Sequence, residues 1–198
     1  IEIFHNGCLL TTIKTQLAGI HNVYNTLAVV AALNEAGVEL KKLAQYFYPF
    51  TGMGRRFQKV CEFNGITVYD DYAHHPTEIK AALQAAASKF GKENVVAVFQ
   101  PHRFTRLQSL WKEFLTAFEN AGRVIVTDVY AASEDAIEGI NGENFAAELS
   151  CEYVSGNMQD VARKLMPSLK KGDVVIGLGA GTITNLGKEL CKLETILR

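Results

Sequence analysis

The chain has 198 residues, of which 48% are hydrophobic, with 20 Lys or Arg against 21 Asp or Glu and a formal net charge of −1. A chain of this length buries about 70% of its extended surface, so it needs no disulfide to hold a core. The balanced charge argues against a general binder of nucleic acids or other polyanions.

The cysteines and the apolar runs indicate a cytoplasmic chain. The four cysteines lie far apart and form no CxxC pair, which is typical of reduced thiols that fill core or surface positions: Cys8, Cys61, Cys151 and Cys191. No apolar run reaches the ~18 residues of a membrane span, and no secretory leader is recognisable. Because Ile1 already lies in a strand-like run, we also expect the chain to be cut from something longer.

The first segment, residues 1–52, predicts only part of a domain. The strand-like runs 1–5 and 8–17 flank Asn6-Gly7, a pair typical of tight hairpin turns. An amphipathic helix follows and ends near Gly37.

A second, short helix is expected over 39–47. One hairpin and two helices are too little for a closed core, so this segment is interpreted as the remnant of a larger domain. The Pro- and Gly-containing segment 49–57 is the best candidate linker. The second domain is therefore expected over 53–198.

From residue 57 the pattern becomes regular. Two strand-like runs flank Asn64-Gly65 and predict a hairpin, and Pro76 predicts the start of a helix that closes at Gly91. Three almost wholly apolar runs follow, at 95–99, 123–127 and 173–178. Continuous Val/Ile runs suit parallel strands that are buried on both faces. Helical patterns separate these strands at 103–120, 143–150 and 157–169, and a last helix is expected at 182–197. This alternation predicts a doubly wound α/β sheet.

Polar residues collect at the carboxyl ends of the predicted strands, where open α/β sheets bind ligands. They are Asp70, Asp71, Tyr72, His74 and His75; then His102, Arg103 and Arg106; then Asp128, Tyr130 and Glu134; and last the segment 177–182. We therefore expect a functional edge of the sheet at these positions.

A metal site is one interpretation of this edge, and a metal hydrolase would follow from it. Its ligands would come from Asp70, Asp71, His74, His75 and His102. Two features count against a metal. Pro76 favours a helix-capping role for His75, and the nearby arginines would repel a cation. No metal ligand is therefore predicted.

The arginines favour an anion. Guanidinium groups bind carboxylates and phosphates in bidentate geometry. Arg103 and Arg106 can share a face at the start of the predicted helix, where the helix N-terminus adds favourable potential. The segment "GLGAGT", 177–182, is weak as a dinucleotide fingerprint but plausible as a turn whose N–H groups approach a ligand.

Two features lie away from this edge. His21, Asn22 and Asn25 occur near the start of the first helix, where Asn22 alone is equally well explained as an N-cap. Arg55 and Arg56 lie in the linker, either as solvated charge or at a ligand cleft between domains.

Together these segments resemble the Mur ligase family, and they follow the family's order over about residues 19–186. The resemblance is carried by "GIHNVYNTLAVVAAL", "FTGMGRRFQ", "VYDDYAHHPTEI", "VFQPHRFTRLQSLWKEF" and "GLGAGTIT". It is greatest to the member that joins L-alanine to UDP-N-acetylmuramic acid. The member that recycles murein peptides typically lacks the "QPHRFTR" segment and is the alternative, together with a non-catalytic nucleotide or amino-acid binding module.

The resemblance implies a three-domain enzyme of which this chain is a part. Residues 1–52 would be the tail of the central ATPase domain, and 53–198 the Rossmann-like C-terminal domain. The sequence contains no G-x-x-x-x-G-K-[ST] loop, so the isolated chain is expected to be inactive. The ligands of the Mg²⁺ that accompanies ATP are expected mostly outside it.

The family chemistry implies roles for particular residues. ATP phosphorylates the carboxylate of the UDP-sugar, and the alanine amine attacks the resulting acyl phosphate. ATP binding would fall to His21, Asn22, Asn25, Arg56 and Asp71, with the Asn25 amide matching adenine. The amino-acid side would be formed by Tyr72, His74, His102, Arg103 and Arg106. Of these, His74, Arg103 and Arg106 are the expected catalytic residues.

Overall fold

The computed structural model describes residues 1–17, 19–50 and 52–197, with His21 and Leu197 described by their backbone alone. The chain divides into two units, Ile1–Met53 and Gly54–Arg198, which are described separately below. The assignment of residues 1–52 to the remnant of a larger domain stays a prediction.

The first unit is a hairpin with two helices. Its elements are β1 (Glu2–His5), β2 (Cys8–Thr12), α1 (Ile20–Glu35), α2 (Leu40–Leu43) and a 3-10 turn, η1 (Ala44–Tyr46). The strands are antiparallel, and both residues of the Asn6-Gly7 turn have positive φ, 50° and 78°, as a type I′ turn requires. A small core joins hairpin and helices through Ile3, Ile13, Val30 and Leu40.

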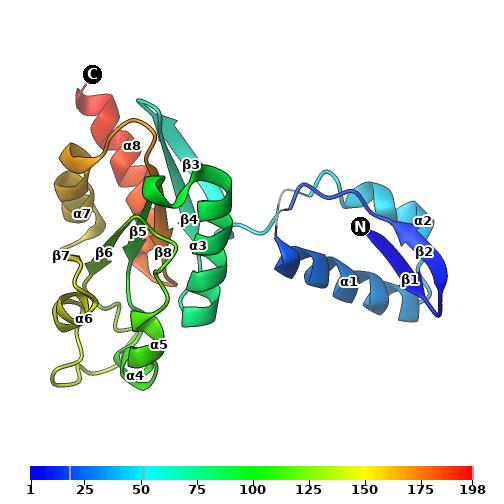
Figure 1. Cartoon of the computed structure of the whole chain (residues 1–198), viewed down its shortest axis with the longest axis horizontal. Coiled ribbons are helices and arrows are strands. Elements are labelled where there is room, and N and C mark those ends of the chain that lie inside the picture. Colours follow the sequence, from blue (N-terminus) through cyan, green and yellow to red (C-terminus); the bar gives the residue numbers. More distant parts are fainter. Residues whose placement is uncertain (18, 51, 198) are drawn as a thin grey trace. The chain divides into compact units, whose positions relative to one another are not determined.

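The second unit is built on a six-stranded sheet in the order β3-β4-β8-β5-β6-β7 (Figure 1). The strands are β3 (Gln58–Phe63), β4 (Ile66–Asp71), β5 (Val95–Phe99), β6 (Arg123–Thr127), β7 (Glu152–Val154) and β8 (Val174–Leu178). Only the hairpin pair β3–β4 is antiparallel. Every residue of β5 and β8 is buried, as their continuous apolar runs predict.

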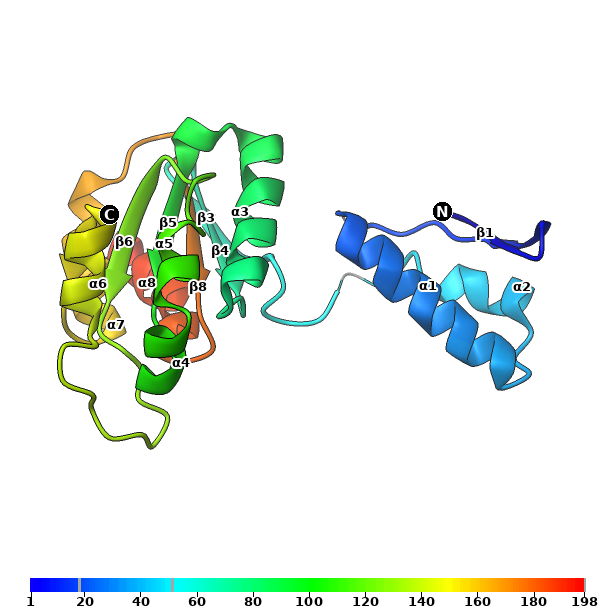
Figure 2. The same ribbon diagram turned by 60° about the horizontal axis from the view of Figure 1, so that its bottom comes forward.

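Helices cover both faces of this sheet (Figure 2). They are α3 (Pro76–Phe90), η2 (Lys92–Asn94), α4 (Phe104–Ser109), α5 (Trp111–Leu115), α6 (Gly142–Leu149), α7 (Met158–Leu165), η3 (Met166–Ser168), η4 (Thr182–Asn185) and α8 (Leu186–Leu197). Leu83 of α3, Phe114 of α5 and Phe145 of α6 belong to one core. Leu165 of α7 and Leu190 of α8 belong to the other. The prediction of a doubly wound, mostly parallel α/β sheet is confirmed. No helix in the described ranges is long and apolar enough to cross a bilayer.

The start of α3 shows how local sequence sets the chain direction after β4. The Nδ1 atom of His75 accepts from the Thr77 N–H at 3.3 Å. The Glu78 carboxylate accepts from the N–H groups of His74 and His75 at 3.0 and 3.3 Å. This capping box confirms the predicted helix start at Pro76 and engages His75 in capping.

Three element predictions need correction. The helix expected over 103–120 is two short helices, α4 and α5, because the backbone leaves helical geometry at Leu110 (φ −116°, ψ 20°). The helix expected from residue 182 begins with the 3-10 turn η4. Strand β7 was not expected, since three residues are too few to show a period, and only its pairing with β6 makes it a strand.

The expectation that all four cysteines are isolated fillers is wrong for one pair. Cys61 on β3 and Cys191 on α8 form a disulfide across 130 positions of sequence. The thiol of Cys8 is exposed, and that of Cys151 is partly buried. Burial raises the pKa of Cys151 to about 11, so this thiol is poorly reactive at neutral pH.

Candidate functional site

The candidate site lies at the carboxyl ends of four adjacent parallel strands, β4, β8, β5 and β6. Parallel pairing places these ends along one edge of the sheet. A direct bridge joins two of the loops, since His102 pairs with Tyr130 in parallel orientation. The sequence prediction that these strand ends form one polar edge agrees with this topology.

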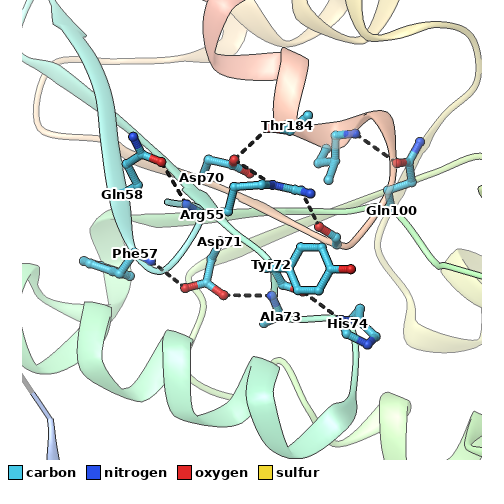
Figure 3. A network of polar contacts seen from close by, with 12 residues as sticks. Arg55, Phe57, Gln58, Asp70, Asp71, Tyr72, Ala73, His74, Gln100 and Thr184 are labelled. Atoms are coloured by element: carbon cyan, nitrogen blue, oxygen red, sulfur yellow. Dashed lines mark hydrogen bonds and ion pairs between the residues drawn. The ribbon is translucent and has the colours of Figure 1, made fainter. Parts of the chain in front are cut away.

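Asp71 ends β4 and orders the chain on both sides of it. Its carboxylate accepts from the Phe57 N–H at 2.7 Å and the Ala73 N–H at 2.8 Å (Figure 3). The side chain is buried, and this burial raises the pKa of Asp71 even though the two N–H groups and Arg56 act in the opposite direction. Asp71 therefore fixes the loop that carries the next two predicted site residues.

Arg55 is a site residue that the sequence did not single out from solvated charge. Its Nε donates to Asp70 at 3.0 Å, and its Nη2 donates to the carbonyl of Gly179 at 2.7 Å. The guanidinium also lies over the ring of Tyr72, 4.8 Å from the centroid. Figure 3 shows Arg55 between Asp70 and Tyr72, with Thr184 donating to the same carboxylate at 2.8 Å. No local pattern around "GRRF" predicts this contact.

The predicted aromatic residues form a row along the edge. Tyr72 meets His74 edge to face with ring centroids 5.1 Å apart, and His74 lies 6.0 Å from His102. His102 in turn stacks on Tyr130 at 5.4 Å, with the ring planes 19° apart. Cζ of Arg56, which the family resemblance assigns to ATP, lies 5.8 Å from the Tyr72 ring centroid. Tyr72, His74 and His102 are therefore brought together as predicted.

His102 is held by one of the two predicted arginines. Nη1 of Arg106 lies 3.0 Å from His102 Nδ1 and 3.2 Å from its carbonyl oxygen. An arginine can only donate, so Nδ1 is the acceptor and the ring proton is on Nε2. Burial lowers the pKa of His102, and the charges of Arg106, His74 and Arg103 lower it further. The charge of Glu134 acts in the opposite direction but does not outweigh them. The ring is therefore neutral at physiological pH.

Arg103 lies in a different environment. Its side chain is half exposed, and its Nη1 is 3.9 Å from Glu134. Glu134 is itself held by the N–H and hydroxyl of Thr105, at 3.1 and 2.7 Å. These two hydrogen bonds lower the pKa of Glu134. The helix that starts here, α4, has only six residues and is shorter than predicted. Arg103 is thus the exposed cation of the pair, and Arg106 the one that orders a neighbour.

The ATP residues predicted in the first unit lie in α1. The helix begins at Ile20 after Gly19, so Asn22 is inside the first turn and the N-cap interpretation is wrong. Asn25 is exposed on the next turn. The side chain of His21 lies outside the described residues. The roles of these residues toward ATP stay predictions.

The metal interpretation finds no support in the described residues. No three His, Cys, Asp or Glu side chains within them are grouped to hold an ion. Asp70 is engaged by Arg55 and Thr184, and His75 caps α3. Within the part of the chain that the structure describes, the same cluster therefore offers no geometry for a metal hydrolase.

Comparison with known proteins identifies the family. Residues 55–181 match the family model described as "Mur ligase, glutamate ligase domain". The UDP-N-acetylmuramate–L-alanine ligase of Caldicellulosiruptor bescii is 47% identical over 184 residues, covering 90% of this chain and 40% of that protein. The ligase of the same name from Desulfotalea psychrophila is 42% identical over 197 residues, covering 94% of this chain and 42% of that protein.

Solved structures agree in fold. The UDP-N-acetylmuramate–alanine ligase of Thermotoga maritima superposes with a TM-score of 0.75 at 28% identity, covering 94% of this chain and 40% of that one. A murein peptide ligase from Psychrobacter arcticus has a TM-score of 0.65 at 21% identity, a likeness of fold alone. The chain spans about two-fifths of the length of these relatives. Since the family model covers most of the second unit and the edge carries the expected residues, the chain belongs to the Mur ligase family.

Proposed function

We propose that this chain is the C-terminal part of an ATP-dependent ligase that joins L-alanine to UDP-N-acetylmuramic acid through an acyl phosphate. Relatives that are 42–47% identical and carry the name of this ligase support the proposal. The phosphate loop and the uridine-binding part are expected in segments that this chain does not contain. Because both ATP and the nucleotide sugar are cytoplasmic substrates, we place the protein in the cytoplasm.

One observation carries the proposal: two neighbouring histidines whose Nδ1 atoms have opposite hydrogen-bond roles, one donating and one accepting, beside an exposed arginine. Nδ1 of His74 lies 2.8 Å from the Tyr72 carbonyl oxygen, which can only accept, so Nδ1 carries a proton and, in the neutral ring, Nε2 is the acceptor. The tautomer of His102 is the reverse, because Arg106 donates to its Nδ1. Arg103 supplies a cation beside them. A proton acceptor, a donor and a guanidinium suit a zwitterionic amino acid.

The chemistry of alanine addition assigns these groups their tasks. Alanine arrives as an ammonium ion, and its nitrogen must lose a proton before it can attack the acyl phosphate. His74 Nε2 accepts that proton. Arg103 binds the carboxylate through its guanidinium fork, while Arg106 keeps His102 in place so that its Nε2–H can donate. Holding the amine in one orientation raises its effective concentration at the acyl carbon.

The ATP side of the proposal rests on fewer contacts. Asn25 is assigned to adenine, Arg56 to the phosphates and Asp71 to the ribose. Each Asp71 oxygen accepts one backbone N–H and retains a second lone pair for a hydroxyl. The ligands of the Mg²⁺ ion that accompanies ATP are expected mostly outside this chain.

A hybrid enzyme tests the proposal. The chain is joined to the unmatched segment of the C. bescii ligase, and phosphate release is measured with ATP, UDP-N-acetylmuramic acid and alanine. We expect alanine-dependent turnover that falls at least about a hundredfold in His74→Gln, and not in the control His5→Gln. The chain alone should release phosphate no faster than the blank.

Two outcomes would replace the proposal. Turnover with a murein peptide but not with alanine would assign the chain to the recycling ligase. Binding of ATP and alanine to the chain by calorimetry, with no turnover in a folded hybrid that binds all three substrates, would favour a binding module.

A further inference from the structure

The glycine-rich segment 177–182 has no task in the proposed reaction. It begins within the end of β8 (Val174–Leu178) and continues at the same edge as the histidines. Gly179 has φ 146°, a conformation that L side chains rarely adopt, and a Cβ there would lie 2.7 Å from the Gln100 carbonyl oxygen. The turn is therefore packed against the neighbouring loop at Gly179. The Gly179 N–H donates to the Asp71 carbonyl oxygen at 3.2 Å and is not available to a ligand. For the other N–H groups of the segment, the approach to a ligand stays a prediction.

Gln100 holds the turn rigidly. It is buried, with 4% of its surface exposed. Its Nε2 donates to Thr182 Oγ1 at 2.9 Å, and its Oε1 accepts from the Ile183 N–H at 2.9 Å. Gln100 is labelled in Figure 3, beside the Arg55 network. Because both ends of the Gln100 amide are hydrogen-bonded, the turn is held in place beside Tyr130, the next residue along the edge.

Tyr130 packs against this turn. A Cβ added to Gly181 would lie 2.6 Å from Tyr130 Cγ and 2.6 Å from Gln100 Oε1. A side chain at position 181 would therefore have to displace the Tyr130 ring or the Gln100 amide. The Tyr130 backbone is also fixed, since its N–H donates to the Pro101 carbonyl and its carbonyl accepts from the Arg103 N–H, both at 2.8 Å.

The opposite partner of Tyr130 is His102. The two rings stack at 5.4 Å, while Arg106 engages the edge of the imidazole at Nδ1. His102 is thus fixed by one contact on its face and one on its edge. The contact on the face of His102 depends on the Tyr130 ring. The position of that ring in turn depends on the absence of a side chain at Gly181.

We propose that Tyr130 is a positioning residue for His102, and that Gly181 leaves the space in which the tyrosine ring lies. The meaning of His102 for alanine binding rests on the proposed function, but the positioning itself does not. The charged and titratable groups that face His102 are Arg103, Arg106, His74 and Glu134, and none of them is altered by changing Tyr130 or Gly181.

Nuclear magnetic resonance of the 198-residue chain tests the positioning without any ligand. In the unmodified chain we expect nuclear Overhauser contacts between the Tyr130 ring and the His102 ring. In Tyr130→Leu the His102 imidazole loses its cover and becomes hydrated. Its ring-proton signals should then shift, and its pKa should rise toward the ordinary value of about 6.5. Tyr130→Phe keeps the aromatic ring, so the ring-proton signals and the pKa of His102 should stay as in the unmodified chain.

Gly181→Ala is the independent second variant. It changes no aromatic or charged group, yet it displaces the Tyr130 ring, so the His102 signals should move as in Tyr130→Leu. The matched control is Tyr46→Leu, which replaces an exposed tyrosine of the first unit. The ring-proton signals of His5 serve as an internal control in every variant. The absence of ring contacts in the unmodified chain would overturn the proposal. Unchanged His102 titration in folded Tyr130→Leu or Gly181→Ala chains would do so as well.

Kinetics in the hybrid ligase separate this proposal from the proposed function. If His102 serves alanine, Tyr130→Leu should raise the KM for alanine about ten- to a hundredfold and leave that for ATP unchanged. A shift of the His102 signals without a change in the KM for alanine would support the positioning proposal and count against His102 as an alanine residue.

Discussion

Arg103 and Arg106 are three positions apart, yet they have different partners. Arg106 donates twice to His102, whereas Arg103 is half exposed with Glu134 as a distant neighbour. A surface ion pair of that kind contributes little, so Arg103 can exchange it for a substrate carboxylate. At the scale of single residues, the two arginines are therefore not interchangeable.

The Arg103→Ala variant should have a lower kcat/KM for the substrate alanine and an unchanged KM for ATP. A hydrogen bond to a charged group contributes roughly 1.5–3 kcal/mol, so kcat/KM for alanine in the hybrid should fall about ten- to a hundred-and-fifty-fold. Arg103→Lys should rescue little, because an ammonium lacks the guanidinium fork. Arg123→Ala, which breaks a pair with Glu152, is the matched control. Losses expressed mainly in the KM for ATP would mean that the anion bound here is a phosphate.

At the scale of elements, the capping box of α3 couples a helix start to the loop that carries His74. Burial alone would raise the pKa of Glu78. The N–H groups of His74 and His75, together with the charges of His74 and Arg56, instead lower it below its ordinary value. The ionised form is therefore stabilised by folding. The contribution of Glu78 to the free energy of unfolding is therefore present above the pKa that Glu78 has in the unfolded chain. It is lost as the pH falls through the pKa of Glu78 in the folded chain.

Glu78→Ala should lower the free energy of unfolding by about 1 kcal/mol at pH 7. The difference between variant and unmodified chain should shrink as the pH falls from about 4 through the lowered folded pKa, because below that pKa Glu78 is protonated in both states. Urea unfolding at several pH values measures this, with the exposed Glu119→Ala as control. A deficit that stays constant down to pH 3 would show that the ionised carboxylate is not what caps the helix.

The Cys61–Cys191 bond ties the edge strand β3 to the last helix. It closes a loop across 130 positions, and disulfides of native proteins stabilise by about 2–4 kcal/mol, chiefly through the unfolded chain. Reductant should therefore lower the unfolding midpoint of the chain. Cys61→Ser should abolish that response, whereas Cys151→Ser should retain it. Four titratable thiols in the unreduced, unfolded chain would contradict the bond.

At the scale of the whole molecule, the linker ends where Arg55 is anchored. Arg55 belongs to the second unit through Asp70 and Gly179, while Met53 before it is exposed. Thermolysin should therefore cut within residues 50–54 and leave the fragment 54–198 intact. A ladder of fragments from both units would count against this boundary.

The fragment 57–198 should be less stable than 54–198. It lacks Arg55, so the buried Asp70 carboxylate loses its ion pair, at a cost of about 3 kcal/mol. Urea unfolding of the two fragments measures the difference. The fragment 54–198 carrying Asp70→Asn is the informative control, because it removes the charge that Arg55 neutralises. Equal stability of the two fragments would contradict the anchoring role of Arg55.

Much of the fold and part of the site could be predicted from sequence. The continuous apolar runs of β5 and β8, the Asn-Gly turns and the Pro76 helix start all depend on neighbours within a few positions. Parallel strands carry their carboxyl ends to one edge, so the grouping of His74, His102 and the arginines also followed. The break at Leu110 and the three-residue β7 were missed, since neither leaves a periodic pattern.

What the sequence by itself determined is therefore the set of local elements, their alternation and the edge at which polar residues meet. The tertiary structure decided which of those residues touch. Arg55 reaches Gly179 across 124 positions, Gln100 reaches Thr182 across 82, and Cys61 meets Cys191 across 130. The physical reason is that turns, caps and periodicity are set by interactions over one or two turns of chain. Contacts between distant loops arise only when the sheet order brings β4, β8, β5 and β6 side by side.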